Sequence, residues 1–502
     1  MKLISALLAP LLLLSFTATS QLITVRTYPV LSEDTYMPLP TRYGGMGKVS
    51  IALLDDEREP FINPATLLSR QATYASVFIL PRVSSWDVRS TSQDLWPSSS
   101  GMWATENRQN AANYFAPVGV IQKSGTTALG LLATVHRTTS HQFRQWSSGP
   151  GSQATQPEEA SFAANNLAVA GSGAALIPGT AIAVGVGATL ADVRGIDGVQ
   201  FLYPDSKSID INGKLREYRL GMFLSPSGQD QLSLLGGWNS MEIHQRAEYE
   251  WSTSPTKNED KNHTWFGQVN YRVPVSERAT IGLLGIGNWR EHPKLPDYPI
   301  SGVPRDPGTT RAFNAGIGVS LETSSNALLA VEYIFEPIHT NTWVEALQDL
   351  DRGDGVVVVR RGEKQQENTY TFANHIARFG AQIEALEWVI LQVGAESRTV
   401  QYDFVSRNYQ WNTEHRAAPQ SRWQEITLTG AVRLSLGSFN VAYGIELLTG
   451  RGLLSGTWLR PILWENFRAA DVIVPPTDWL SIKPAPVFTH QVSIRYTFEA
   501  TE

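Results

Sequence analysis

Long stretches of this chain alternate apolar and polar residues one by one, and this alternation constrains the fold more than any other feature. Because successive side chains of a β-strand point to opposite faces, a period of two predicts strands with one apolar and one polar face. In residues 311–322, for example, the apolar side chains fall on every second position: Phe313, Ala315, Ile317, Val319 and Leu321. About sixteen such strands are expected, at 71–84, 113–123, 126–137, 164–175, 180–193, 216–225, 231–250, 264–274, 278–290, 311–322, 326–337, 373–385, 387–405, 423–436, 439–449 and 487–498.

The connections between these strands alternate in length. Short turns are expected at Ser124-Gly125, Pro274 to Glu277, Thr323 to Ser325 and Gly437-Ser438, whereas the long polar connections fall at 85–112, 138–163, 194–215, 291–310, 338–372 and 450–486. Outer-membrane barrels have short turns at one end and long loops at the other, and lipid cannot satisfy an open sheet edge. The sequence therefore predicts an all-β protein, a transmembrane antiparallel β-barrel of about 14–16 strands.

Composition narrows the functional classes. The 502 residues contain no cysteine, which excludes disulfides and thiolate metal sites. A net charge of -6 gives no basic footprint for nucleic acid, so no nucleic-acid partner is expected. The uncharged stretch 166–191 is long enough for a membrane helix, but Pro178-Gly179 near its middle and the alternation after it predict a hairpin instead.

The N-terminus predicts export. Lys2 precedes an apolar run from Leu3 to Phe16, and the small residues Ala18 and Ser20 suit signal-peptide cleavage. We expect a signal peptide at 1–20, an N-terminal segment at 21–70 and a barrel at 71–502, located in the outer membrane among its lipids. A membrane anchor is the alternative, but the apolar run is short for a span.

The last predicted strand ends on aromatic residues. Val492, Ile494, Tyr496 and Phe498 alternate up to the C-terminus. This resembles the terminal strand that outer-membrane proteins present to their assembly machinery, although four further residues follow Phe498 here. Tyr496 and Phe498 are therefore the predicted assembly signal.

The most specific motif lies before the first strand, in residues 41–70. It contains Gly45-Met46-Gly47, a short apolar stretch, the acidic pair Asp55-Asp56 and then Asn63-Pro64-Ala65. The glycines permit close backbone approach or a positive φ. No lysine-serine or lysine-threonine pair follows them, which excludes a phosphate-binding loop.

These elements resemble, in order and spacing, the N-terminal hatch of the FadL family of outer-membrane transporters for fatty acids and hydrocarbons. The resemblance implies a hatch, or plug, inside the barrel lumen, with the gate residues Gly45, Met46, Gly47, Asp55, Asp56, Asn63, Pro64 and Ala65. It also implies passive uptake of a small hydrophobic molecule without a cofactor. The family barrel has fourteen strands, fewer than the sixteen expected here.

Charged residues at inward positions are predicted to pair with the hatch: Arg272, Glu332, Arg378, Glu384, Arg433 and Glu446. PorV-like barrels of secretion systems begin with a similar motif. The alternative function is therefore a structural or binding barrel whose extracellular loops engage a protein partner.

We expect neither an enzyme nor a metal site. The histidines form no HExxH pair, and no serine has a nucleophile-elbow motif. Asp349, Asp351 and Asp354 have calcium-like spacing, but Gly353 stands where an EF-hand would need a ligand. A solvated acidic loop is the expectation there, with calcium as the alternative.

Overall fold

The computed structural model describes residues 39–69, 74–91, 103–147, 158–194, 206–225, 230–249, 255–292, 308–324, 326–346, 348–416, 421–453, 481–482 and 487–499. The predicted signal peptide at 1–20 lies outside the described residues. Within the described part, no helix is both long and apolar enough to cross a membrane.

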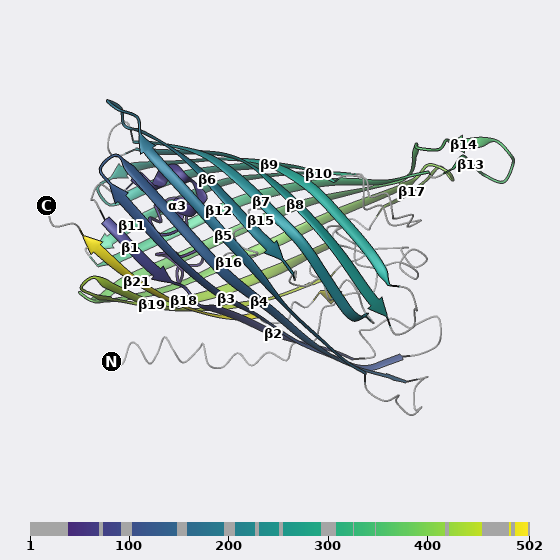
Figure 1. Cartoon of the computed structure of the whole chain (residues 1–502), viewed down its shortest axis with the longest axis horizontal. Coiled ribbons are helices and arrows are strands. Elements are labelled where there is room, and N and C mark those ends of the chain that lie inside the picture. Colours follow the sequence, from purple (N-terminus) through teal and green to yellow (C-terminus); the bar gives the residue numbers. More distant parts are fainter. Residues whose placement is uncertain are drawn as a thin grey trace.

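The described residues form a closed antiparallel β-barrel of sixteen strands (Figure 1). Its strands are β1 (Tyr74–Ile79) with β2 (Arg82–Thr91), β3 (Trp103–Ser124), β4 (Thr127–Ser147), β5 (Glu158–Leu176), β6 (Ile182–Val193), β7 (Ser206–Leu224), β8 (Gln231–Tyr249), β9 (Thr256–Ser276), β10 (Ala279–His292), β11 (Gly308–Ser324), β12 (Ala327–Glu345), β15 (Lys364–Leu386), β16 (Val389–Asn408), β18 (Ser421–Leu436), β19 (Phe439–Leu453) and β21 (Val487–Glu499). Each pairs with its sequence neighbour, and β21 pairs with both β19 and β1, which closes the barrel.

The first barrel position is interrupted. The expected strand 71–84 is divided into β1 and β2 at Leu80-Pro81. Both pieces pair with β21 and β3 in unchanged register, so they occupy one place in the wall. A proline has no N–H to donate to a ladder, and Pro81 stands within two positions of Pro117 across the β2–β3 pair, which explains the break.

The strands are longer than alternation alone suggested. β4 continues to Ser147 and β5 begins at Glu158, so much of the expected loop 138–163 is sheet. Tilted crossing of the hydrocarbon needs about ten residues, and the extra length therefore carries the sheet beyond the membrane at the long-loop end. Four short elements complete the set: β13 (Leu350–Asp351), β14 (Val357–Val359), β17 (Thr413–Arg416) and β20 (Ser481–Ile482).

The two faces of the wall differ as the alternation predicts. Apolar side chains such as Leu129, Val186 and Leu220 lie exposed on the outside, whereas polar residues such as Asn270, Glu332 and Thr429 are buried inside. An apolar exterior on a closed sheet is the requirement for a barrel in lipid. The fold is therefore a transmembrane β-barrel of outer-membrane type.

Candidate functional site

Residues 39–69, hereafter the lumenal segment, lie inside the barrel. They form irregular turns, the short helix α3 (Glu59–Ile62) and the 3-10 helix η1 (Pro64–Leu68), seen within the barrel in Figure 1. The segment bonds to β7 and β8 at one end, to β9 and β12 in its middle and to β16 and β18 at the other end. Contacts with strands all around the wall place it across the lumen.

The glycine motif fits closely against the wall. The N–H of Gly45 donates to Gln392 Oε1 (3.1 Å), and that of Gly47 donates to Thr429 Oγ1 (2.8 Å). Gly47 has φ +66°, and a Cβ there would lie 2.4 Å from the Phe379 carbonyl oxygen. Between them Met46 is fully buried. Glycine is therefore required at 47 for both conformation and space.

The acidic pair divides into two roles. The Asp55 carboxylate accepts hydrogen bonds from the Thr41 hydroxyl and from the backbone N–H groups of Arg42, Glu57 and Arg58, so it holds the turn together. Burial, with the neighbouring Glu57 carboxylate, raises the pKa of Asp55 to about 6 against these bonds. Asp56 is only half-buried.

Asn63-Pro64-Ala65 docks on β6, β7 and β8. The Asn63 amide donates to the Met222 carbonyl (3.2 Å), Ser233 Oγ (2.7 Å) and the Leu234 carbonyl (3.0 Å). Its Oδ1 accepts from the Ala65 N–H and so caps η1, where Pro64 suits the first helical position.

Two barrel residues that face this motif, Gly185 on β6 and Gly221 on β7, are glycines. A Cβ on Gly221 would lie 1.8 Å from Asn63 Oδ1, and one on Gly185 would lie 2.5 Å from the Ala65 nitrogen. Side chains at these wall positions would prevent docking.

Ion pairs anchor the segment to β9 and, across the lumen, to β18 and β21. Arg272 on β9 binds Glu59 (2.7 Å) and donates to the carbonyls of Ser50 and Ile51. Arg433 and Arg495 each lie 3.2 Å from Glu57. Although burial opposes ionisation, these arginines lower the pKa of Glu57.

A second set of charges surrounds Lys48. Its Nζ lies 3.0 Å from Glu446 and 3.7 Å from Glu396, and Glu396 also pairs with Arg378 (2.6 Å). Glu332 accepts from the backbone N–H groups of Ser50 and Ile51.

Of the inward charges predicted to pair with the hatch, Arg272, Glu332, Arg433 and Glu446 contact the segment directly, and Arg378 is linked to it through Glu396. Glu384 is exposed beside a short turn and does not point at the segment. Five further charged residues were not predicted to take part: Lys48, Glu57 and Glu59 in the segment and Arg219 and Arg495 in the wall. Strand parity could have found Arg495, because its neighbour Ile494 points outward.

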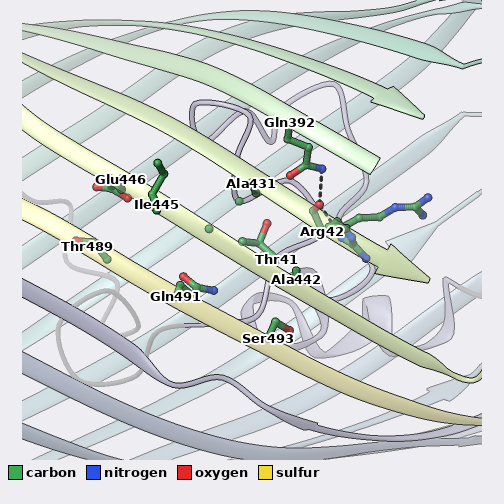
Figure 2. A pocket seen from close by; sticks show the side chains of 13 residues that line it. Thr41, Arg42, Gln392, Ala431, Ala442, Ile445, Glu446, Thr489, Gln491 and Ser493 are labelled. Carbon is green, nitrogen blue, oxygen red and sulfur yellow. Dashed lines mark hydrogen bonds between the residues drawn. The ribbon is translucent and has the colours of Figure 1, made fainter. Parts of the chain in front are cut away.

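The lumen has an apolar side and a polar side. Next to the early strands, an apolar cluster joins the segment to the wall: Leu39, Phe61, Ile62, Leu67, Phe78, Ile121, Ala128, Leu132, Ala170, Ala174, Leu235 and Phe266. Beside β18, β19 and β21, a small pocket open to solvent is lined mainly by small and polar side chains. Figure 2 shows Ala442, Gln491 and Ser493 around it, together with Thr41 of the segment.

The predicted assembly residues lie on the strand that closes the barrel. Phe498 is exposed on the outer surface, and its ring lies 4.4 Å from that of Tyr496. Tyr496 pairs with Phe439 of β19 and with Val77 of β1.

The acidic loop at 349–354 belongs to a small hairpin formed by β13 and β14. Its carboxylates accept backbone N–H groups: Asp349 from Arg361, Asp351 from Gly353 and Asp354 from Val356. Among the described residues, no group of three or more histidine, aspartate or glutamate side chains is arranged to hold a metal.

The chain is thus a transmembrane barrel whose lumen holds an N-terminal segment. Its sequence matches no family profile and no curated protein. Among solved structures, a Pseudomonas aeruginosa FadL homologue is 10% identical over 93% of this chain and 99% of its own, with a TM-score of 0.39. The P. putida toluene transporter TodX is 10% identical over 91% and 98%, with a TM-score of 0.37.

CdiB from Acinetobacter baumannii scores similarly, with 11% identity over 84% of this chain and 60% of its own and a TM-score of 0.36. Likeness at this level carries no argument about activity. The fold assignment rests on this chain's own strand pairing.

Proposed function

We propose that this protein is an outer-membrane channel for passive uptake of small hydrophobic compounds, fatty-acid-like or hydrocarbon, and that the lumenal segment is its gate. The observation that carries the proposal is the placement of the segment across the lumen, with wall glycines opposite Asn63-Pro64-Ala65. A segment held by hydrogen bonds and ion pairs, and not by covalent bonds to the wall, can move aside.

A route for an apolar molecule is supported by the apolar cluster. Phe78 of β1 belongs to this cluster and lies two residues before the break at Leu80-Pro81. There the Leu80 N–H donates to the Pro117 carbonyl, but neither Pro81 nor Pro117 can donate in return. A seam with fewer ladder bonds beside apolar side chains favours exit towards lipid, which spares a hydrophobic solute passage through water.

The test is uptake of toluene and of a long-chain fatty acid into proteoliposomes containing the full barrel or a variant lacking residues 41–70. We expect the deletion to change the uptake rate while the barrel keeps its heat-modifiable migration on gels, which reports folding. A folded deletion variant with unchanged uptake of every hydrophobic probe refutes the gate.

A second candidate function is binding of a protein partner at the extracellular end. The β13–β14 hairpin projects beyond the barrel in Figure 1, next to β17. It is tied to the β16–β17 turn by Arg352 Nε to the Gln410 carbonyl and by Gln410 Nε2 to the Asp351 carbonyl, both 2.8 Å. Val356, Val357 and Trp411 are exposed there, away from the membrane.

Exposed apolar side chains on an ordered projection favour a protein contact. Replacing residues 346–363 by a glycine-serine linker should abolish stoichiometric co-purification of such a partner. It should leave hydrophobic uptake unchanged, so the experiment separates the two functions.

A further inference from the structure

The outer surface of β4 to β9 changes from apolar to polar and charged residues towards the long-loop end. On β7, β8 and β9 the border between these surfaces is marked by Tyr218, Trp238 and Trp265. The ring centroid of Trp238 lies 5.8 Å from that of Tyr218 and 6.3 Å from that of Trp265. Tyrosine and tryptophan favour the lipid–water interface, so these rings mark its extracellular level. The border lies towards the long-loop ends of the strands.

Basic side chains begin directly beyond that border. We call the exposed basic residues on β4, β7 and the end of β6 the basic belt; they are Arg137, Arg194, Lys214 and Arg216. Arg137 follows the exposed Val135 by two residues, and Arg216 stands two residues from the exposed Tyr218. Each belt residue therefore projects outward at or just above the expected headgroup level.

The belt is continuous across neighbouring strands. Arg137 is paired with Asn165 on β5, and the backbone N–H of Arg194 donates to the side chain of Asn166. Lys214 is paired with Asp192 on β6. With neighbouring strands about 4.8 Å apart, the belt spans about 15 Å from β4 to β7, the scale of one headgroup.

The belt has an excess of positive charge. Arg194 pairs with Asp192 (3.3 Å), but among the described residues Lys214 and Arg216 have no ion pair. Glu242, which faces Lys214 across the β7–β8 ladder, is engaged instead by Lys261 (3.5 Å) and His244 (3.3 Å).

The opposite end of the barrel has the reverse character. Four exposed acids lie at its short turns, Glu277, Glu322, Glu384 and Glu387, and they outnumber the exposed Arg278 there. The basic belt is therefore specific to the long-loop end of the barrel and is not a uniform solubilising surface.

We propose that the basic belt binds the phosphate groups of a glycolipid in the outer leaflet of the membrane. A phosphorylated sugar headgroup places negative charge at the interface, directly beyond the acyl chains that contact Leu190, Leu220 and Val135. Arginine and lysine at this level donate charge-assisted hydrogen bonds to phosphate oxygens. Such binding concerns the outside of the barrel and is independent of the uptake function.

The test is a titration of the purified full-length barrel with lipid A, read by native mass spectrometry as bound lipid per protein. We expect Lys214→Ala with Arg216→Ala to weaken lipid A binding by about 30-fold. Arg216→Lys in the wild-type background should largely retain it. The matched control is Arg246→Ala with Lys257→Ala, which removes the same charge from the same end but further from the border.

Equal weakening by the control pair would overturn the proposal, because it would reduce the effect to overall charge. Displacement of bound lipid A by inorganic phosphate at the same phosphate concentration would also overturn it, in favour of a free-anion site. Should the β7 pair prevent folding, Arg137→Ala carries the same expectation of weaker binding, and unchanged affinity there would refute the belt.

Discussion

Replacing Gly221 of β7 by alanine should release the Asn63-Pro64-Ala65 motif from the wall. A Cβ at position 221 would lie 1.8 Å from Asn63 Oδ1 and 2.9 Å from its Cγ, so the Asn63 side chain must leave. Gly236 on the adjacent strand β8 is the matched control, because no atom lies within 4 Å of a Cβ built there.

The magnitude follows from the bonds that Asn63 makes. Its amide donates to three acceptors and its oxygen caps η1, giving four hydrogen bonds within a fully buried site. At about 1 kcal/mol net for each bond, displacement costs about 3–4 kcal/mol of docking free energy. Every 1.4 kcal/mol is tenfold, so the undocked population should rise by about 100- to 1,000-fold.

Hydrogen exchange of the amides in residues 59–68 measures this directly. We expect Gly221→Ala to lose protection there by roughly two to three orders of magnitude, while the barrel strands keep theirs and Gly236→Ala behaves as wild type. Equal protection of this segment in Gly221→Ala and Gly236→Ala would show that the contact between Gly221 and Asn63 does not hold the motif in place. Should the gate be correct, the uptake rate of toluene should also rise in Gly221→Ala only.

Three further predictions concern Asp55 and Met46 in the segment and Phe498 on the last strand. Because the pKa of Asp55 is raised to about 6, its contribution to docking is fully present below about pH 4 and is lost as the pH rises through about 6. Asp55→Asn should remove this pH dependence from the hydrogen exchange of the segment. The same pH dependence of exchange in Asp55→Asn as in the wild type would contradict the prediction. Met46→Ala should cost about 2–5 kcal/mol of docking through the cavity it leaves, seen as faster exchange of residues 43–53, with unaltered exchange as the contrary result. Phe498→Ala should lower the yield of heat-modifiable barrel in cells without preventing refolding in detergent, and a normal cellular yield would count against the assembly signal.

The strand positions were predictable because alternation is a local property. Each of the sixteen predicted stretches overlaps a strand, and the outward parity of residues such as Ile317 and Leu220 follows directly from the pleat. The extensions of the strands at the long-loop end were not predictable, because strands beyond the membrane need no apolar face and therefore lose the alternating pattern. The break in the first strand was visible as Pro81, but the position of Pro117 opposite Leu80 could be recognised only once the register was known.

The lumenal segment shows the same division. Its glycines, acidic pair and Asn63-Pro64-Ala65 motif could be singled out from order and spacing. The glycines and Asn63-Pro64-Ala65 make close contacts with the wall, whereas Asp55 bonds within the segment. Glu57 gave no signal, because it lies beside Arg433 and Arg495 only after the barrel has closed. Nothing local distinguishes a buried, doubly paired glutamate from a solvated one.

By itself, therefore, the sequence predicted a closed barrel with an apolar exterior. Period-two patterning alone also suits a soluble sandwich, but the alternating short and long connections and the need to satisfy every backbone group in lipid favour the barrel. Only the tertiary structure decided which wall residues meet the segment. Those contacts join positions hundreds of residues apart, such as Gly47 with Thr429, and depend on strand register around the whole ring. A shift of one residue in that register would turn Thr429 away from the lumen and expose it to lipid.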